Sequence, residues 1–386
     1  MRMTQLKTIA DIQTGPFGSQ LHKEDYVETG TPIVTVEHLG NRVFTEQNLP
    51  RVSDSDKARL IKYTLSTGDI VFSRVGSVDR CSYVDKSHDG WMFSGRCLRV
   101  RPTEPVDSLY LYYYFCLEET KQFVRNIAVG ATMPSINTKL LGEVEIALPD
   151  LNNQKRIAAV LSSLDDKIEN NQKLNDNLQQ QAAALFSSLY DRSNTEVRFT
   201  DLIQILGGGT PKTGENTYWN GNIAFFTPKD VGTPYTLITE KTISKEGLSH
   251  CNSRLYPVNT VFVTARGTVG KVGMSGVPMA MNQSCYALVG KETHQLLVYF
   301  YTLKAVDRLK HKASGAVFDA ITTRDFESEQ IMELSHDDAT AFLRVAEPMF
   351  QEVLNNNIEN LRLSTLRDSL LPKLMSGEID VSAVQL

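Results

Sequence analysis

The chain contains the same sequence pattern twice in tandem, and this duplication constrains its fold more than any other feature. The run from Gly68 to Arg80 returns as the run from Asn259 to Lys271. Further along, Val129-Gly130-Ala131 before Ile136 returns as Ser314-Gly315-Ala316 before Ile321. A period of about half the chain is too long for a solenoid, whose repeats run ~20–50 residues. The sequence therefore predicts two domains of one kind, an arrangement that suits a target with two parts.

Each half ends in a segment whose apolar residues recur at alternating spacings of three and four, which indicates a coiled-coil helix. In the first segment these positions are Leu161, Leu164, Ile168, Asn171, Asn175, Leu178, Ala182, Leu185 and Leu189. In the second they are Phe342, Ala346, Met349, Val353, Asn356, Asn360, Leu363, Arg367, Leu370 and Leu374. Asp150 is the expected N-cap of the first helix, and Gly377 is the expected stop signal of the second.

These patterns predict a mixed α/β (α+β) chain of four segments. We expect globular domains over residues 1–150 and 195–333, and long helices over residues 151–192 and 334–378. Each domain should contain β-rich runs, one helix and a closing strand; the expected helices run from Leu109 to Arg125 and from Leu296 to His311. If a pseudo-two-fold axis relates the halves, the helices run antiparallel and the domains lie at opposite ends.

Two asparagines interrupt the apolar seam of each helix. An antiparallel pair would bring Asn171 and Asn175 against Asn356 and Asn360. Buried polar layers cost stability but fix the register of a coiled coil, and this is the role we expect. The alternative is that the asparagines face solvent. Side chains more than ~8 Å apart across the seam would exclude the paired layer.

Composition narrows the class of protein. The net charge of -5 does not favour a nucleic-acid binder, but most of the acidic excess lies in the C-terminal helix region, so a DNA-binding role would depend on local basic faces. The longest apolar run, Leu109 to Leu117, is too short to cross a bilayer, and the N-terminus lacks a secretory pattern. Five cysteines without a CxxC pair indicate reduced thiols in a cytoplasmic protein and no metal site.

No catalytic signature is present. The N/D-P-P-Y/F loop of amino-methyltransferases is missing, and the glycines of Arg266 to Gly273 match neither a dinucleotide-binding nor a phosphate-binding loop. Pro149-Asp150 with Asp165-Asp166-Lys167 resembles a metal-nuclease pattern, but the second group lies on the heptad helix, where it could not join the first around a metal. These motifs therefore give no indication of a catalytic site.

The order of these segments resembles the specificity (S) subunit of type I restriction-modification systems. Matching details are Gly-Pro-Phe-Gly-Ser at 15–19, Gly-Gly-Thr-Pro at 208–211, Gly130-Ala131-Thr132 before Pro134-Ser135-Ile136, Gln154-Lys155-Arg156-Ile157-Ala158 after Leu148-Pro149, and the run from Ala265 to Lys271. The second helix departs from the family pattern, because it begins Leu334-Ser335-His336 without the usual proline and glutamine.

The resemblance implies a DNA-binding protein that has no catalytic residues and itself binds no cofactor. Each globular domain would be a target recognition domain that reads one half of a split site in double-stranded DNA. The helices would set the spacing and bind two methyltransferase (M) subunits, and restriction (R) subunits would join to form the nuclease. Two other interpretations stay open: a recognition subunit of another DNA-modification system, and a coiled-coil protein scaffold without a DNA role.

The duplication also divides the candidate DNA-binding residues into two groups. Residues shared by both halves should position phosphates or shape the fold: Ser73 with Thr264, Gly76 with Gly267, Ser77 with Thr268, and Arg80 with Lys271. Residues that differ between halves are better candidates for base edges, because side-chain hydrogen bonds to base edges carry sequence information. These are Gln20, Lys23, Glu37, His38 and Arg74 in the first domain, and Thr210, Lys212, Lys229, Asp230, Arg266, Asn282 and Gln283 in the second.

Overall fold

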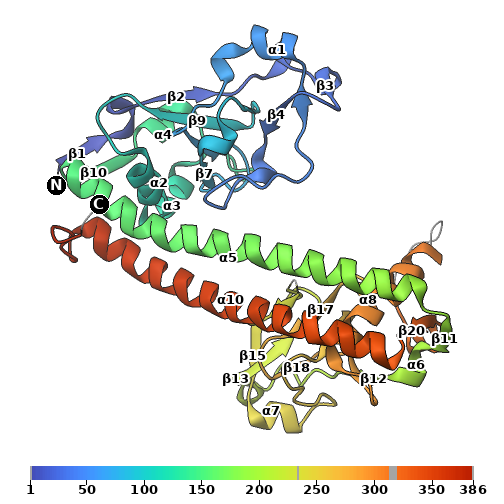
Figure 1. Ribbon diagram of the computed structural model, residues 1–386. Helices are drawn as coiled ribbons and strands as arrows, with labels where there is room; N and C mark the ends of the chain where they lie inside the picture. The colour runs from blue at the N-terminus through green and yellow to red at the C-terminus, as the bar shows by residue number, and fades with distance from the viewer. Residues whose placement is uncertain (1, 233, 313–319, 385–386) are drawn as a thin grey trace. The chain divides into compact units, whose positions relative to one another are not determined.

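The structure is a computed structural model that describes residues 2–232, 234–312 and 320–384. The repeated Ser314-Gly315-Ala316 segment lies outside the described residues. The chain divides into two compact units: unit 1 comprises residues 1–167 and 363–386, and unit 2 comprises residues 168–362 (Figure 1). Each unit therefore joins one globular domain to parts of two long helices.

The first domain is built on two four-stranded sheets. Its helices are α1 (Asp54–Arg59), α2 (Ser108–Cys116), α3 (Glu118–Ile127) and α4 (Thr138–Gly142), and its strands are β1 (Arg2–Gln5), β2 (Ala10–Thr14), β3 (Tyr26–Val27), β4 (Thr31–Val34), β5 (Arg51–Val52), β6 (Ile70–Ser73), β7 (Cys81–Tyr83), β8 (Met92–Phe93), β9 (Cys97–Pro102) and β10 (Glu145–Leu148). One sheet has the order β2-β9-β6-β7 and is antiparallel, and the other has the order β3-β5-β4-β8. A separate ribbon pairs β1 with β10, from Arg2 opposite Leu148 to Gln5 opposite Glu145.

The second domain repeats this plan. Its helices are α6 (Phe199–Leu202), α7 (Lys245–Ser249), α8 (Gln295–Lys312) and α9 (Thr323–Glu327), and its strands are β11 (Thr195–Arg198), β12 (Ile203–Gly207), β13 (Trp219–Phe226), β14 (Tyr235–Thr236), β15 (Lys241–Ile243), β16 (Val261–Thr264), β17 (Val272–Ser275), β18 (Met279–Met281), β19 (Cys285–Gly290) and β20 (Gln330–Glu333). The order β12-β19-β16-β17 corresponds to β2-β9-β6-β7, and the β11–β20 ribbon corresponds to β1–β10. The predicted mixed α/β fold with a duplicated domain is confirmed.

The helix expected from Leu109 to Arg125 is in fact two helices. The backbone leaves the helical region at Leu117, whose φ and ψ are -58° and 133°, and α3 begins at Glu118. Two glutamates in the first turn of α3 suit a helix start, because carboxylates are favourable near the positive end of a helix dipole. In the second domain the matching helix α8 is continuous from Gln295 to Lys312.

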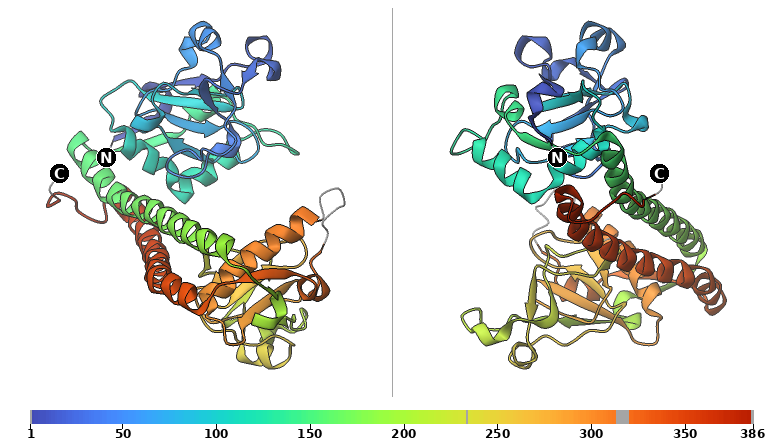
Figure 2. Two further views of the ribbon diagram at one scale, coloured as in Figure 1. Left: turned by 45° about the vertical axis from the view of Figure 1, so that its right-hand side comes forward. Right: turned by 90° about the vertical axis from the view of Figure 1, so that its left-hand side faces the viewer.

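Two long helices, α5 (Leu151–Arg192) and α10 (His336–Ser376), carry the predicted heptads. Asp150 caps α5 by accepting a hydrogen bond from the Asn153 amide at 3.0 Å, and α10 stops before Gly377, whose φ is +79°. In both units the two helices lie side by side and run in opposite directions (Figure 2). The predicted antiparallel pairing is therefore confirmed within each unit.

The seam asparagines of unit 2 contact one another directly. Asn171 Nδ2 donates to Asn360 Oδ1 at 2.9 Å, and Asn356 Nδ2 donates to Asn175 Oδ1 at 2.8 Å. Asn175 Nδ2 also donates to Asn357 Oδ1 at 2.9 Å. These distances are well inside the ~8 Å limit set above. The helices of this unit thus share a buried, hydrogen-bonded polar layer.

Among the described residues, no helix has the length and apolar character needed to cross a membrane.

Candidate nucleic-acid interface

The predicted residues gather on loops at one edge of each main sheet. In the antiparallel sheet β2-β9-β6-β7, the ends of β2 and β6 and the starts of β9 and β7 share one edge. Three loops leave that edge: the glycine loop (residues 14–20), the β6–β7 turn (74–80) and the pre-β9 loop (94–96). A fourth, the capped turn (35–38), follows β4, whose parallel neighbour β8 leads into the pre-β9 loop.

The second domain presents the same four loops. They are the glycine loop (207–213), the β16–β17 turn (265–271), the pre-β19 loop (282–284) and the capped turn (227–230) after β13. Strand β13 is parallel to β18, as β4 is to β8. In both domains the candidates lie on these loops or at the ends of the strands that lead into them, apart from Lys23, which begins the short helix Lys23–Asp25.

Backbone hydrogen bonds fix the loops of the first domain to one another. The Arg74 amide donates to the Arg96 carbonyl at 2.8 Å, and the Ser94 amide donates to the Val34 carbonyl at 2.9 Å. A Cβ on Gly15 would lie 2.2 Å from the Ser94 carbonyl oxygen, so only glycine permits this approach. The four loops form one surface that is held by main-chain contacts, which leaves side chains free to vary.

The same bonds recur in the second domain. The Ala265 amide donates to the Ser284 carbonyl at 2.8 Å, and the Asn282 amide donates to the Phe226 carbonyl at 3.0 Å. A Cβ on Gly208 would lie 2.2 Å from the Asn282 carbonyl oxygen. Residues that the sequence places in the same turn therefore also occupy the same place in three dimensions.

Three candidates are buried: for His38 the burial argues against a base contact, and for Ser73 and Thr264 it favours shaping the fold over a phosphate contact. The exposed fractions of His38, Ser73 and Thr264 are 1%, 1% and 0%. Ser73 Oγ donates to the Val75 carbonyl at 2.8 Å, and Thr264 Oγ1 donates to the Thr268 carbonyl. These two hydroxyls hold the turn that follows them, so they shape the fold.

His38 and Asp230 perform the same local task in the two capped turns. His38 Nδ1 accepts from the Thr35 amide at 3.0 Å, and Asp230 Oδ2 accepts from the Thr227 amide at 2.8 Å. Asp230 Oδ1 also accepts from the Glu240 amide at 2.7 Å. These acceptors are engaged by backbone amides and so hold the conformation of their turns.

Other candidates are partly engaged. Gln20 Oε1 accepts from the Tyr63 hydroxyl at 2.7 Å, Asn282 Oδ1 accepts from the Ser284 amide at 3.0 Å, and Lys229 lies 3.6 Å from a Glu240 carboxylate oxygen. Arg74 is half-buried. The exposed candidates are Lys23, Glu37, Ser77, Arg80, Thr210, Lys212, Lys229, Arg266, Thr268, Lys271 and Gln283.

Two exposed residues of the same surface were missed from sequence. Phe17, in the first glycine loop, is 60% exposed, and Arg96 is exposed in the pre-β9 loop. The candidates Asn282 and Gln283 lie in the matching loop of the second domain. When the two copies are aligned through Cys97 and Cys285, these candidates correspond to Ser94 and Gly95, and Arg96 is the next residue of that loop.

The helix carboxylates of the nuclease-like pattern, Asp165 and Asp166, form hydrogen bonds and ion pairs with neighbouring side chains. Asp165 accepts from the Tyr113 hydroxyl at 2.6 Å and from Arg367 at 2.6 Å, and Asp166 accepts from Arg42 at 2.5 Å. Within the described part of the chain, no group of three or more His, Cys, Asp or Glu side chains could hold a metal ion.

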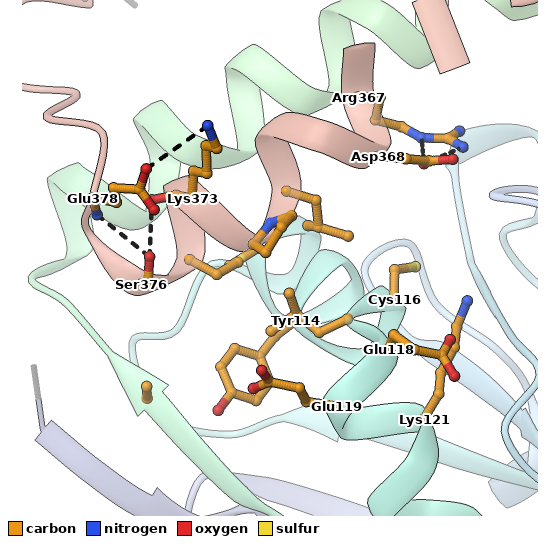
Figure 3. Close-up of a pocket in the computed structure, with 15 residues that line it drawn as sticks. Tyr114, Cys116, Glu118, Glu119, Lys121, Arg367, Asp368, Lys373, Ser376 and Glu378 are labelled. Carbon is orange, nitrogen blue, oxygen red and sulfur yellow. Dashed lines mark hydrogen bonds and ion pairs between the residues drawn. The ribbon is translucent and has the colours of Figure 1, made fainter. Parts of the chain in front are cut away.

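Unit 1 also contains a hollow of about 930 Å³, and its lining includes none of the predicted DNA-binding residues. It lies between the corner of α2 and α3, with Tyr114 and Glu119, and the last turns of α10, with Arg367 and Lys373 (Figure 3). The Lys373 ammonium and the Glu378 carboxylate lie 3.8 Å apart at its rim. This hollow and the loop surface are lined by different residues.

Comparison with known proteins agrees with the duplicated architecture. The model of the family described as "Type I restriction modification DNA specificity domain" matches residues 1–180 and 192–332. The HindI specificity subunit of Haemophilus influenzae is 24% identical to this chain, and the match covers 82% of this chain and 88% of that subunit. The MjaIX specificity subunit of Methanocaldococcus jannaschii is 25% identical, and the match covers 72% of this chain and 71% of that subunit.

A solved structure shares the fold. The crystal structure of a type I restriction-modification system S subunit from M. genitalium matches with a TM-score of 0.62 at 16% identity, over 97% of this chain and 95% of that chain. The family model covers most of the chain in two segments, one for each domain. The chain therefore belongs to the type I restriction-modification DNA specificity family.

Proposed function

We propose that this chain is the non-catalytic recognition subunit of a type I restriction-modification complex. Each globular domain reads one half of a bipartite site in double-stranded DNA. The chain supplies no catalytic residue and binds no cofactor, and methyltransferase subunits modify adenine at the site that it selects. The complex acts in the cytoplasm, where the DNA is.

One observation carries the proposal: the two domains build the same loop surface with different side chains. Main-chain bonds fix the loops in both, as Arg74 to Arg96 and Ala265 to Ser284 do, while exposed side chains such as Phe17 and Thr210 differ. Base readout uses side chains, whereas phosphate contacts only set position. The two loop surfaces share their backbone contacts but expose different side chains, as would be needed to read two different half-sites.

Exposed cations on these loops supply the attraction to DNA that the net charge of -5 does not. Arg80 and Arg96 lie on the first surface, and Lys212, Arg266 and Lys271 lie on the second. Salt-dependent release of counterions from neutralised phosphates drives such binding. The helices α5 and α10 would set the gap between half-sites and bind two M subunits, to which R subunits attach.

Sequencing of modified bases tests the proposal. The chain is expressed with its methyltransferase subunit in a host that lacks adenine methylation, and methylated adenines are located by single-molecule sequencing. The expected result is two short specified sequences separated by a gap of fixed length. Methylation of one contiguous motif, or an unchanged pattern when the chain is omitted, would refute it.

A further inference from the structure

The two glycine loops approach their neighbouring loops in the same way but present different chemistry. Gly15 lies against Ser94, and Gly208 lies against Asn282, each at a distance that excludes a Cβ. Counting from these glycines, Phe17 corresponds to Thr210. Counting from their partners, Gly95 corresponds to Gln283.

In the first domain this position holds an exposed aromatic ring. A Cβ on Gly95 would lie 2.6 Å from the Phe17 Cβ, so glycine at residue 95 gives Phe17 the space it occupies. The Arg74 guanidinium carbon lies 5.8 Å from the centre of the Phe17 ring, and Arg74 Nη1 donates to the Gly95 carbonyl at 3.2 Å. The ring is therefore supported from one side by the glycine backbone and a cation, yet 60% of Phe17 is exposed.

In the second domain the same position holds a hydrogen-bonding pair. The Thr210 hydroxyl donates to Gln283 Oε1, and both residues are exposed. Ala265, which is buried, stands where the first domain has Arg74. Because Thr210 holds the amide oxygen, the Gln283 Nε2 hydrogens remain available to an acceptor outside the protein.

These two chemistries match different features of a base pair. In the major groove, thymine presents a 5-methyl group that apolar side chains contact, and purines present N7 as an acceptor. A phenyl ring can contact the methyl group but donates no N–H or O–H bond, whereas an amide N–H can donate to N7. The same place in the two domains would thus favour different bases.

We propose that Phe17 and Gln283, which lie on corresponding loop pairs of the two surfaces, are specificity-determining residues, each of which contacts one base pair of its half-site. Phe17 contacts a thymine 5-methyl group with Gly95 and Arg74 as its support. Gln283 donates from Nε2 to a purine N7 with Thr210 as its support. This inference rests on the proposed function and adds the base features that two positions recognise.

Atom-level substitution in the DNA tests the assignment with the complete methyltransferase complex. In duplexes that carry the recognised site, each thymine is replaced in turn by uracil, which lacks the methyl group, and each purine by its 7-deaza analogue. One uracil should lower the methylation rate of the wild-type complex about fivefold or more, as loss of a base-edge contact does. The same uracil should leave the rate of Phe17→Ala unchanged, because that variant has already lost the contact.

Gln283 has the corresponding test. One 7-deazapurine should slow the wild-type complex about fivefold or more and leave Gln283→Ala unaffected.

Phe17→Leu keeps an apolar side chain and should keep the uracil sensitivity. Phe123→Ala removes another exposed phenyl ring, 41% exposed on α3, and is the matched control: it should behave as wild type.

The outcomes separate the two proposals. The assignment of Phe17 is wrong if no uracil slows the wild-type complex, or if Phe17→Ala stays as sensitive to uracil as wild type. The assignment of Gln283 is wrong if no 7-deazapurine slows the wild-type complex, or if Gln283→Ala stays as sensitive to the 7-deazapurine as wild type. A wild-type complex that methylates no bipartite site refutes the proposed function itself.

Discussion

The Asp165 carboxylate of α5 accepts a hydrogen bond from the Arg367 guanidinium of α10 at 2.6 Å. The Tyr113 hydroxyl of α2 donates to the other oxygen of the same carboxylate at 2.6 Å, so Asp165 ties the first domain and both helices together within unit 1. Burial opposes the charge of Arg367, but the hydrogen bond and attraction to Asp165 outweigh it and raise the pKa of Arg367. Burial, and then the Asp165 charge, raise the pKa of Tyr113.

Unit 2 has an apolar cluster at the matching positions. The offset that aligns Asn171 with Asn356 places Phe350 where unit 1 has Asp165, and Ala182 where it has Arg367. Phe350 is 3% exposed and its ring centre lies 5.5 Å from that of Phe300. The polar contact therefore distinguishes two otherwise similar helix junctions.

Asp165→Ala should lower the free energy of unfolding by about 2 kcal/mol, because it leaves Arg367 and the Tyr113 hydroxyl without their buried acceptor. Arg367 is 29% exposed, so solvent limits the loss. Urea unfolding measures the difference. Asp368→Ala is the control, since this carboxylate also accepts from Arg367 at 2.8 Å but is 65% exposed, and it should cost less than ~0.5 kcal/mol. Equal losses for the two variants would contradict the structural role of Asp165.

In the asparagine layer of unit 2, removing one asparagine should destabilise the protein more than replacing a hydrogen-bonded pair with leucines. Asn175→Ala leaves Asn356 and Asn357 without their partner and should cost ~1–3 kcal/mol. Asn175→Leu together with Asn356→Leu should recover most of this loss, because an apolar pair needs no hydrogen bonds and only the half-buried Asn357 still lacks its partner. If the layer fixes register, the double variant should also form mixed oligomers in size-exclusion chromatography with light scattering. A double variant that stays uniform would leave the layer no role in register.

Replacing Lys271 should change the salt dependence of DNA binding and leave the sequence preference unchanged. Lys271 is exposed on the β16–β17 turn, at the position that matches Arg80, and a cation shared by both domains suits a phosphate contact. Lys271→Ala should weaken binding to all DNA sequences and reduce the slope of log affinity against log salt by ~1. Titration of labelled duplexes at several salt concentrations, in complex with the methyltransferase, measures this slope. A changed methylation motif with an unchanged slope would instead make Lys271 a base contact.

We expect the lengths of α5 and α10 to set the length of the unspecified gap between the two half-sites. Four residues inserted at matched places in α5 and α10 add about 6 Å to each helix. The unspecified gap of the methylated motif should therefore lengthen by one or two base pairs, while both half-sites keep their sequences. Insertion into α5 alone is the control and should disrupt the pairing of the helices. An unchanged gap after the matched insertions would show that the helices do not set it.

Much of this architecture could be predicted from the sequence, because duplication and heptads are patterns that survive without side-chain detail. The repeat located the turns at Gly76 and Gly267, whose φ values of +75° and +81° require the same residue in both copies. The heptads located the helix pair, and antiparallel pairing then placed the asparagines. The break at Leu117 was not expected, because the stretch from Leu109 to Arg125 contains neither proline nor glycine to end a helix.

The candidate surface was harder to predict, because sequence does not show which polar atoms the fold itself uses. Thr35 to His38 and Thr227 to Asp230 have the spacing of a capping box, and this pattern could have identified their structural role. Ser73 and Thr264 are polar in sequence but lie beneath the turn that they support. The exposure of Phe17 could not be predicted, because an apolar ring is usually buried and only the structure shows that 60% of this residue is exposed.

The most direct test of two independent readers compares one variant in each domain. Arg74→Ala removes the cation beneath Phe17 in the first domain, and Arg266→Ala removes an exposed cation of the second. Methylated adenines are located by single-molecule sequencing for wild type and both variants. We predict that each variant relaxes base preference in a different half of the motif by about 1–3 kcal/mol at one position, while the other half and the gap stay unchanged. Relaxation of the same half by both variants, or of both halves by either one, would contradict the account.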